Sequence, residues 1–300
     1  MISVREALTR ATGQLSAHSD SRPTALADAA LLLRHVLGID RPTLIAHPER
    51  PIDRDQQAAY QRLIERRLTF EPVQYITGSQ EFFGLNLRVT PAVLIPRPET
   101  ELLVETVLSF VNPVTHSSQS HRDEWVPPQP LRIADIGTGS GAIALALAQA
   151  LPPAEMFAVD LSETALAIAH ENALTHGLAV RIRFLRSDLL TALAAEPPFD
   201  IIVSNPPYVP LADAPDLHPQ VREHEPATAL FGGDDGLDIY RRLIPQAAAR
   251  LRPAGLLALE IGHGQQAAIV ALLAGWDDVE FVADLQGIPR VVTARLPSRS

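Results

Sequence analysis

The chain has 300 residues, of which 46% are hydrophobic and 20% are charged, and its mean hydropathy is +0.07. These values are typical of a globular protein with one large and one small domain, or with two modest domains, and they argue against wholesale disorder. The net charge of −10 lies mainly in residues 101–300, where 13 arginines face 24 acidic residues, which disfavours direct binding of nucleic acid.

The residue types that are missing exclude several kinds of chemistry. Cysteine is absent, which excludes disulfides and thiolate metal sites. All 25 basic residues are arginine, which excludes lysine-dependent phosphate loops and Schiff bases. The ten histidines form no metal-binding pair, so we expect no metal site. Neither a signal peptide nor a membrane span is evident, so we expect a cytoplasmic protein without membrane contact.

Residues 1–72 predict a small helical bundle. Val4, Leu8 and Ala11 share one helical face, which is the spacing of an amphipathic helix. Gly38 follows an apolar run as a helix stop, and Asp53 is a plausible N-cap for a third long helix.

Residues 73–98 predict a β-hairpin connector. The runs VQYITG, EFF and LNLRVTP are β-type and are separated by Gly78 and Gly84. A helix then starts near Pro98, a residue that suits the first helical turn. The proline-rich segment 112–130 predicts a surface loop.

Residues 99–300 predict a doubly wound, Rossmann-like α/β domain. Apolar strand candidates alternate with helix candidates from residue 132 onward, which favours a parallel sheet with helices on both faces. The last two strand candidates, VEFVADL and PRVVTARL, have no helix between them and predict an antiparallel edge.

A glycine-rich turn follows the first strand of this domain. Its residues are Gly137, Thr138, Gly139, Ser140 and Gly141, with the spacing G-x-G-x-G rather than the G-x-G-x-x-G of dinucleotide binding. S-adenosylmethionine needs close backbone approach but has no pyrophosphate to be held, so this turn favours that cofactor. A tight strand-to-helix turn without a ligand is the alternative.

Acidic residues end the next two strands. Asp160 can accept hydrogen bonds from both ribose hydroxyls of an adenosine, as in nucleoside-binding proteins generally. Asp188 can accept from the adenine amino group, or can instead cap the following turn, and Leu189 would lie against the adenine face. Parallel strand ends converge on one crevice, so we expect these residues to surround the cofactor.

The tetrapeptide Asn205-Pro206-Pro207-Tyr208 ends the fourth strand. An amide or arylamine nitrogen is a poor nucleophile, so its methylation requires the two N–H bonds to be held and the lone pair to be aimed. The Asn205 side-chain oxygen and the Pro206 carbonyl can accept those two bonds, the two prolines stiffen the backbone, and the Tyr208 ring offers a stacking face. Positioning at about 3–3.5 Å then carries most of the catalysis. A simple turn after a strand is the alternative.

Other polar clusters carry weaker signals. His218 and His224 flank a loop, and we expect them to be solvated. Asp234, Asp235 and Asp238 lack the glutamate that a calcium loop requires, so we expect them to cap the following helix.

The whole pattern resembles the peptide-chain-release-factor glutamine methyltransferases. The resemblance covers nearly the full length and is carried by LADAALLLRHVLG, EPVQYITGSQEFFGL, VLIPRPETELLVE, DIGTGSGAIALALA, SNPPYVP, ALFGGDDGLDIYRRL and GIPRVVTAR. It implies methylation of the glutamine amide in the Gly-Gly-Gln tripeptide of bacterial class I release factors, a step of translation termination.

The resemblance also implies residue roles. The glutamine amide would occupy the site from Asn205 to Tyr208, residues 1–72 would dock the release factor, and residues 137–141, Asp160 and Asn205 match the family's cofactor positions. Leu189 departs from relatives that carry an aromatic residue there.

Two other functions stay open at this point. The N-P-P-Y motif is shared with nucleic-acid amino methyltransferases, which would transfer methyl groups to DNA or RNA with a steep salt dependence of binding. A non-catalytic binding module would keep the fold without turnover.

Overall fold

The structure is a computed structural model that describes residues 1–17, 22–111 and 130–298. Its contacts divide the chain into two compact units. The first comprises Met1–Ser79 together with Pro215–Glu225, and the second comprises Gln80–Ala214 and Pro226–Ser300. The segment predicted as a loop at 112–130 lies, apart from its last residue, outside the described residues.

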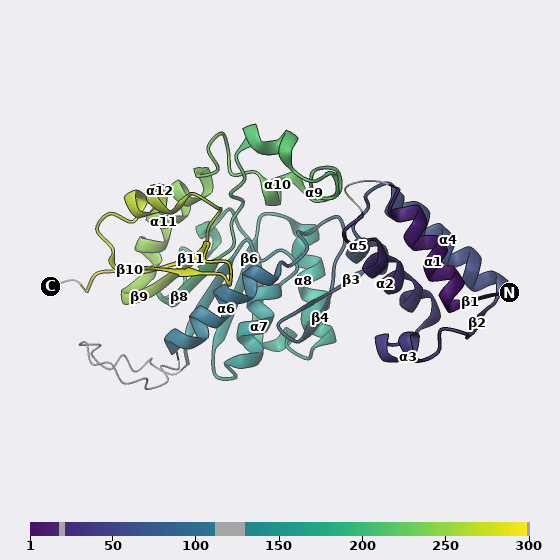
Figure 1. Cartoon of the computed structure of the whole chain (residues 1–300). Coiled ribbons are helices and arrows are strands. Elements are labelled where there is room, and N and C mark those ends of the chain that lie inside the picture. Colours follow the sequence, from purple (N-terminus) through teal and green to yellow (C-terminus); the bar gives the residue numbers. More distant parts are fainter. Residues whose placement is uncertain (18–21, 112–129, 299–300) are drawn as a thin grey trace, which may run out of the picture. The chain divides into compact units, whose positions relative to one another are not determined.

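The first unit is a helical bundle, as predicted (Figure 1). Its elements are β1 (Ile2–Ser3), α1 (Val4–Leu15), α2 (Ala25–Leu37), α3 (Arg41–Ala46), β2 (Pro51–Ile52), α4 (Arg54–Leu68), α5 (Val73–Thr77) and α9 (Pro219–His224). Asp53 caps α4, because its Oδ1 accepts from the Gln56 backbone N–H at 2.8 Å. Gly38 ends α2 with a left-handed φ of 62°. The capping signals in the sequence were therefore sufficient to locate these helix ends.

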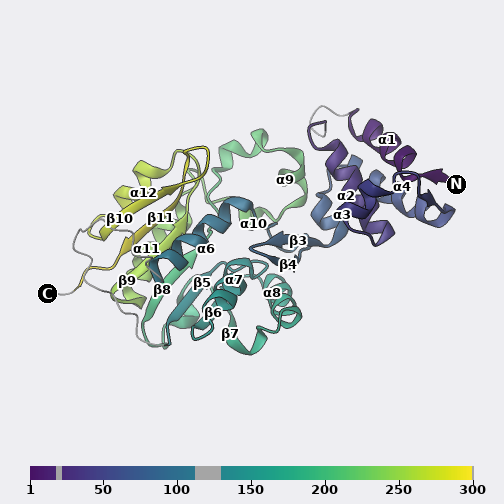
Figure 2. The same ribbon diagram turned by 60° about the horizontal axis from the view of Figure 1, so that its bottom comes forward.

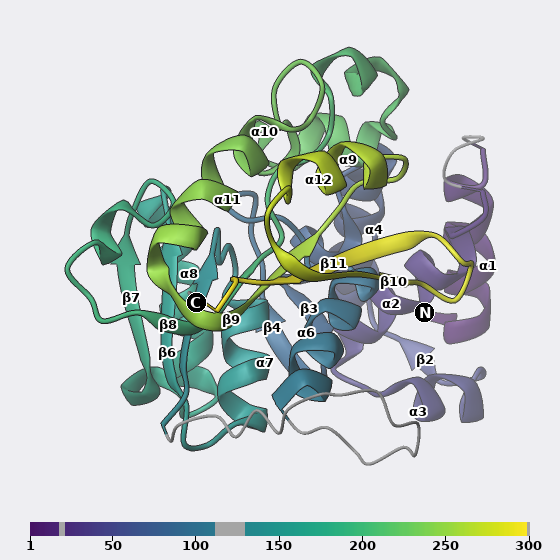
Figure 3. The same cartoon turned by 90° about the vertical axis from the view of Figure 1, so that its left-hand side faces the viewer.

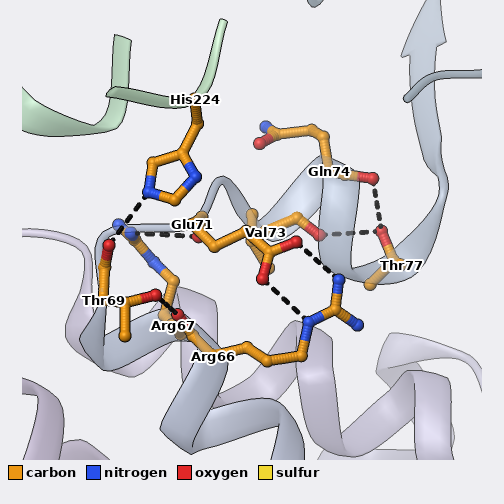
Figure 4. A network of polar contacts seen from close by, with 8 residues as sticks. All are labelled: Arg66, Arg67, Thr69, Glu71, Val73, Gln74, Thr77 and His224. Carbon is orange, nitrogen blue, oxygen red and sulfur yellow. Dashed lines mark hydrogen bonds and ion pairs between the residues drawn. The ribbon is translucent and has the colours of Figure 1, made fainter. Parts of the chain in front are cut away.

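The prediction of a strand at VQYITG is wrong, because Val73–Thr77 is the short helix α5. Val73 and Ile76 are three positions apart and both are buried in the core of the bundle. The Thr77 hydroxyl donates back to the Val73 carbonyl at 3.0 Å, as Figure 4 shows. Burial of one helical face therefore outweighs the β propensity of these residues.

Of the two histidines that we expected to be solvated, His218 is exposed, as predicted, whereas His224 is half-buried. His224 hydrogen-bonds the Thr69 carbonyl through Nε2 at 2.9 Å (Figure 4). His218 accepts from the backbone N–H of Gln220 at the start of α9 and meets the Phe70 ring edge-on, with ring centroids 6.0 Å apart. The sequence does not indicate the contacts with Thr69 and Phe70, because these two partners are about 150 residues away in the chain.

The predicted hairpin, β3 (Ser79–Phe82) and β4 (Leu85–Arg88), belongs to the second unit from Gln80 onward and is followed by α6 (Pro98–Val111). The hairpin is joined to helices of the same unit by side-chain hydrogen bonds. Glu101 accepts from the Phe83 backbone N–H at 2.9 Å, and Asn172 accepts from that of Arg88 at 2.7 Å.

The predicted doubly wound sheet is present and has seven strands in the order β10-β11-β9-β8-β5-β6-β7. From β9 to β7 the strands are parallel, and β11 and β10 add the predicted antiparallel edge, drawn in yellow in Figure 3. The strands are β5 (Arg132–Ile136), β6 (Glu155–Asp160), β7 (Ile182–Arg186), β8 (Phe199–Ser204), β9 (Leu251–Glu260), β10 (Asp277–Ala283) and β11 (Pro289–Arg295).

Helices cover both faces of this sheet (Figure 2). One face packs against α6, α7 (Ala142–Ala150) and α8 (Glu163–Thr175), and the other against α11 (Asp238–Arg250) and α12 (Gln266–Leu272). The remaining elements are α10 (Ala227–Leu230) and short 3₁₀ turns at Ala179–Arg181, Thr191–Leu193 and Leu211–Asp216. Because β5, β6, β8 and β9 are neighbours and parallel, the polar residues that follow them meet at one edge.

Candidate active site

The glycine turn after β5 leaves open space on one side. Gly137 and Gly139 have φ values of 74° and 57°, and a Cβ added at either would meet no atom closer than 4.0 Å. Gly141 differs, because a Cβ there would lie 2.6 Å from Leu145 Cδ1 in α7. Ala169 of α8 would lie 3.1 Å from the same Cβ, so Gly141 permits close packing between α7 and α8, whereas Gly137 and Gly139 expose backbone that a ligand can approach.

Asp135 organises this turn from the buried side. Its Oδ2 accepts from the Thr138 hydroxyl at 2.6 Å and from the Ala144 N–H at 3.1 Å. Burial raises the pKa of Asp135 to about 7, although these two hydrogen bonds oppose the shift. Its Oδ1 is buried and makes no hydrogen bond among the described residues. The Thr138 side chain is thus buried and hydrogen-bonded within the turn itself. Ser140 is also buried, and its carbonyl accepts from Asn172 Nδ2 at 2.8 Å.

Asp160 lies directly beside the glycine turn. Its Oδ2 accepts from the Gly139 N–H at 2.9 Å, and its Oδ1 accepts from the Ser162 N–H at 2.9 Å. The N–H groups of Gly137 and Thr138 donate to the Val159 carbonyl, which precedes it. The structure therefore brings together the turn and the first acidic residue named from the sequence.

Asp188 and Leu189 follow β7, the next strand of the sheet. The Asp188 carboxylate pairs with Arg242 of α11 at 2.6 Å and is about half exposed. Leu189 has a φ of 51° and packs half-buried against the core beneath α11. A role for either residue in holding adenine stays a prediction.

The N-P-P-Y segment starts next to the glycine turn. Ser204 is the register partner of Ile136, and its hydroxyl donates to the Ile136 carbonyl at 2.6 Å. Asn205 and Gly137 are therefore the residues that follow paired positions on neighbouring parallel strands. Asn205 is half-buried and Pro206 is buried.

A buried hydrogen-bond network supports Asn205 from behind. Its Nδ2 donates to Thr100 Oγ1 at 3.1 Å, and the Thr100 hydroxyl donates to Glu260 Oε2 at 2.7 Å. The Tyr208 hydroxyl donates to Glu260 Oε1 at 3.3 Å. Burial raises the pKa of Glu260 to about 7, and the hydroxyls of Thr100 and Tyr208 oppose this shift.

A second glycine-rich segment packs against the backbone of the motif. A Cβ at Gly232 would lie 2.5 Å from the Pro207 carbonyl oxygen, and one at Gly236 would lie 2.2 Å from that of Tyr208. A Cβ at Gly262 would lie 2.9 Å from the Tyr208 ring. These three glycines therefore allow close packing around Pro207 and Tyr208.

Thr100 and Glu260 were not identified as site residues from the sequence. Glu260 ends β9 as Asp160 ends β6, so the rule that polar strand ends converge could have found it. Thr100 lies in the first turn of α6, and nothing in its local sequence indicates a partner 105 positions away.

Family comparisons match both parts of the chain. Residues 6–78 match the family described as the PrmC N-terminal domain, and residues 125–217 match the methyltransferase small domain. The chain is 43% identical over 278 residues to a release factor glutamine methyltransferase of Koribacter versatilis, covering 92% of this chain and 93% of the relative. It is 47% identical over 271 residues to one of Bradyrhizobium diazoefficiens, covering 89% and 87%.

Among solved structures, a methyltransferase from Pyrococcus furiosus superposes with a TM-score of 0.51 at 18% identity, covering 72% of this chain and 90% of that one. This likeness supports the fold alone. Within the part of the chain that the structure describes, no helix has the length and apolar character needed to cross a bilayer.

Proposed function

The chain belongs to the release factor glutamine methyltransferases, and from this premise we propose that it methylates the side-chain amide of a release-factor glutamine with S-adenosylmethionine. The observation that carries the proposal is the position of Asn205 beside Gly137, which follows from the pairing of Ser204 with Ile136. An acceptor for amide hydrogens thus lies next to a backbone suited to a small ligand.

The residues present fit S-adenosylmethionine. Gly137 and Gly139 offer open, side-chain-free backbone, Asp160 lies within hydrogen-bond distance of that turn, and Asp135 has a buried oxygen without a partner among the described residues. When bound, the cofactor supplies an electrophilic methyl group on a sulfonium. The residues proposed to hold it are Gly137, Thr138, Gly139, Ser140, Gly141, Asp160, Asp188, Leu189 and Asn205.

The chemistry of the substrate explains the use of Asn205. A glutamine amide nitrogen shares its lone pair with the carbonyl, so it attacks only when it is held in a productive geometry. We assign one N–H bond to Asn205 Oδ1 and the other to the Pro206 carbonyl. Pro207 restricts the backbone that follows, and the Tyr208 ring flanks the planar amide. The proton leaves after the nitrogen has gained the methyl group, so no strong base is needed.

The partner is proposed to be a bacterial class I release factor, with its Gly-Gly-Gln glutamine as the methyl acceptor. The helical first unit is proposed to dock this protein. The acidic charge of residues 101–300 does not suit a nucleic acid, and the relatives above carry release-factor names, so a nucleic-acid amino methyltransferase is not favoured.

Labelled S-adenosylmethionine tests the proposal directly. Incubation with a release factor should label that protein, and changing its Gly-Gly-Gln glutamine to alanine should abolish the label. Asn205→Ala should lower kcat by about 100-fold or more, since it removes an acceptor that aligns the nucleophile. Asn86→Ala, at an exposed position of β4, serves as the control. Label appearing in ribosomal RNA or DNA instead would refute the assignment.

A further inference from the structure

We infer that Thr100 and Glu260 are positioning residues that determine which end of the Asn205 side chain faces the substrate. The inference rests on the proposed function and adds a requirement to it. An asparagine amide has an oxygen and an NH₂ group at similar positions, and only the oxygen can accept an N–H bond from glutamine. A pocket for a glutamine amide therefore needs a means of excluding the reversed rotamer.

The hydrogens available to Glu260, Thr100 and Asn205 fix the direction of each hydrogen bond and exclude the reversed rotamer. An ionised Glu260 has no hydrogen to donate, so at 2.7 Å from Thr100 it must accept the single hydroxyl hydrogen of that residue. Thr100 Oγ1 then has only lone pairs left. The Asn205 atom 3.1 Å away must supply the hydrogen, and it is the NH₂ group. The amide oxygen of Asn205 is consequently the atom left for the substrate.

The network is buried, which makes a wrong orientation costly. Thr100 is 4% exposed and Glu260 is 2% exposed, so water does not readily substitute for a missing partner. With the amide reversed, the Asn205 oxygen would face the lone pairs of Thr100. Its NH₂ group would then face the N–H bonds of the substrate, and both contacts would be repulsive.

Protonation of Glu260 would remove this control. A protonated carboxyl can donate to Thr100, which frees the threonine hydroxyl to donate to an Asn205 oxygen, and the reversed amide is then satisfied. The charged and titratable groups that act on Glu260 are Glu99 in α6, Tyr208, and Arg290 in β11. Tyr240 of α11 donates its hydroxyl to the Glu260 backbone carbonyl at 2.7 Å. Glu99 favours the protonated form, whereas Arg290 and the Tyr208 hydroxyl favour the ionised form.

The test uses a matched pair of variants at Thr100. Thr100→Val keeps the shape but removes the hydroxyl, and Thr100→Ser restores it. In Thr100→Val the Asn205 NH₂ group has lost the acceptor that held it in place, so the reversed amide is no longer excluded. We therefore expect kcat of Thr100→Val to fall about 10-fold to 100-fold. Thr100→Ser should stay within about threefold of the wild type, since its hydroxyl can remake both hydrogen bonds. KM for S-adenosylmethionine should change little in either variant, whereas the melting temperature of Thr100→Val should fall, because the buried Glu260 loses a hydrogen-bond donor.

A pH profile provides a second readout that a structural role would not move. In the wild type, kcat should decrease as the pH falls through the Glu260 pKa of about 7. In Glu260→Gln this acidic limb should disappear and the rate should be low at every pH, because a glutamine amide can donate to Thr100 or accept from it.

The outcomes separate this inference from the function on which it rests. A wild-type enzyme that fails to label any release factor overturns the proposed function, and this inference with it. An active wild type with a Thr100→Val variant of unchanged kcat overturns the positioning role alone. Loss of activity in Thr100→Ser equal to that in Thr100→Val, or an acidic limb that persists in Glu260→Gln, does the same.

Discussion

The close packing of Gly236 against the Tyr208 carbonyl predicts a large effect of one added methyl group. Gly236 has a φ of 74°, and a Cβ there would lie 2.2 Å from the carbonyl oxygen. The left-handed backbone costs an alanine about 1–2 kcal/mol, and overpacking adds about 1–3 kcal/mol. We expect Gly236→Ala to lower the free energy of unfolding by about 2–5 kcal/mol. A displacement of Tyr208 by about 1 Å would lower kcat about 100-fold.

Gly264 offers a matched control for this prediction. Its φ is 80°, yet no atom lies within 4 Å of an added Cβ. Gly264→Ala should therefore show only the backbone cost of about 1–2 kcal/mol, with kcat nearly unchanged. Urea unfolding and initial rates of methyl transfer, measured on both variants, separate the cost of the left-handed backbone from the cost of the steric clash with Tyr208. Equal stability and equal rates in the two variants would refute the packing argument.

Two further predictions concern buried charges. Arg67 and Asp28 form a buried ion pair at 2.8 Å, so Arg67→Ala should lower the free energy of unfolding by about 3–5 kcal/mol. The control, Arg186→Ala, breaks an exposed ion pair with Glu163 and should lower it by at most about 1 kcal/mol. Similar values for the two variants in urea unfolding would contradict this prediction. Burial raises the pKa of Asp135 to about 7, so its contribution to stability is present at low pH and is lost as the pH rises through that value. Between pH 5 and pH 8 the wild type should therefore lose about 3 kcal/mol relative to Asp135→Asn, and parallel pH profiles would count against a raised pKa.

Local patterns in the sequence were sufficient for most of the secondary structure. Asp53 and Gly38 marked helix ends because capping depends on a few adjacent residues. The alternation of apolar strands and helices predicted the parallel sheet, and the missing helix before PRVVTAR predicted its antiparallel edge. The same reasoning failed at Val73–Thr77, where β-type residues form a helix because the bundle buries one helical face.

The candidate site was only partly predictable. The sequence predicted that Gly137, Asp160 and Asn205 lie at one edge of the sheet, because each ends or follows a strand and the ends of parallel strands converge. It did not identify Thr100, which interacts with Asn205 across 105 positions of sequence. His224 was wrongly expected to be solvated for the same reason, since its partner Thr69 is remote in the chain.

The sequence by itself determined the order of most elements, the glycine turn and the place of the N-P-P-Y motif after a strand, because these depend on residue type and short spacing. The tertiary structure alone decided how the Asn205 amide is oriented and which glycines are sterically required. The direction of a hydrogen bond and the burial of a side chain depend on contacts between residues that are far apart in the sequence. In this chain it is the folded sheet that brings the start of α6 and the end of β9 to the same asparagine.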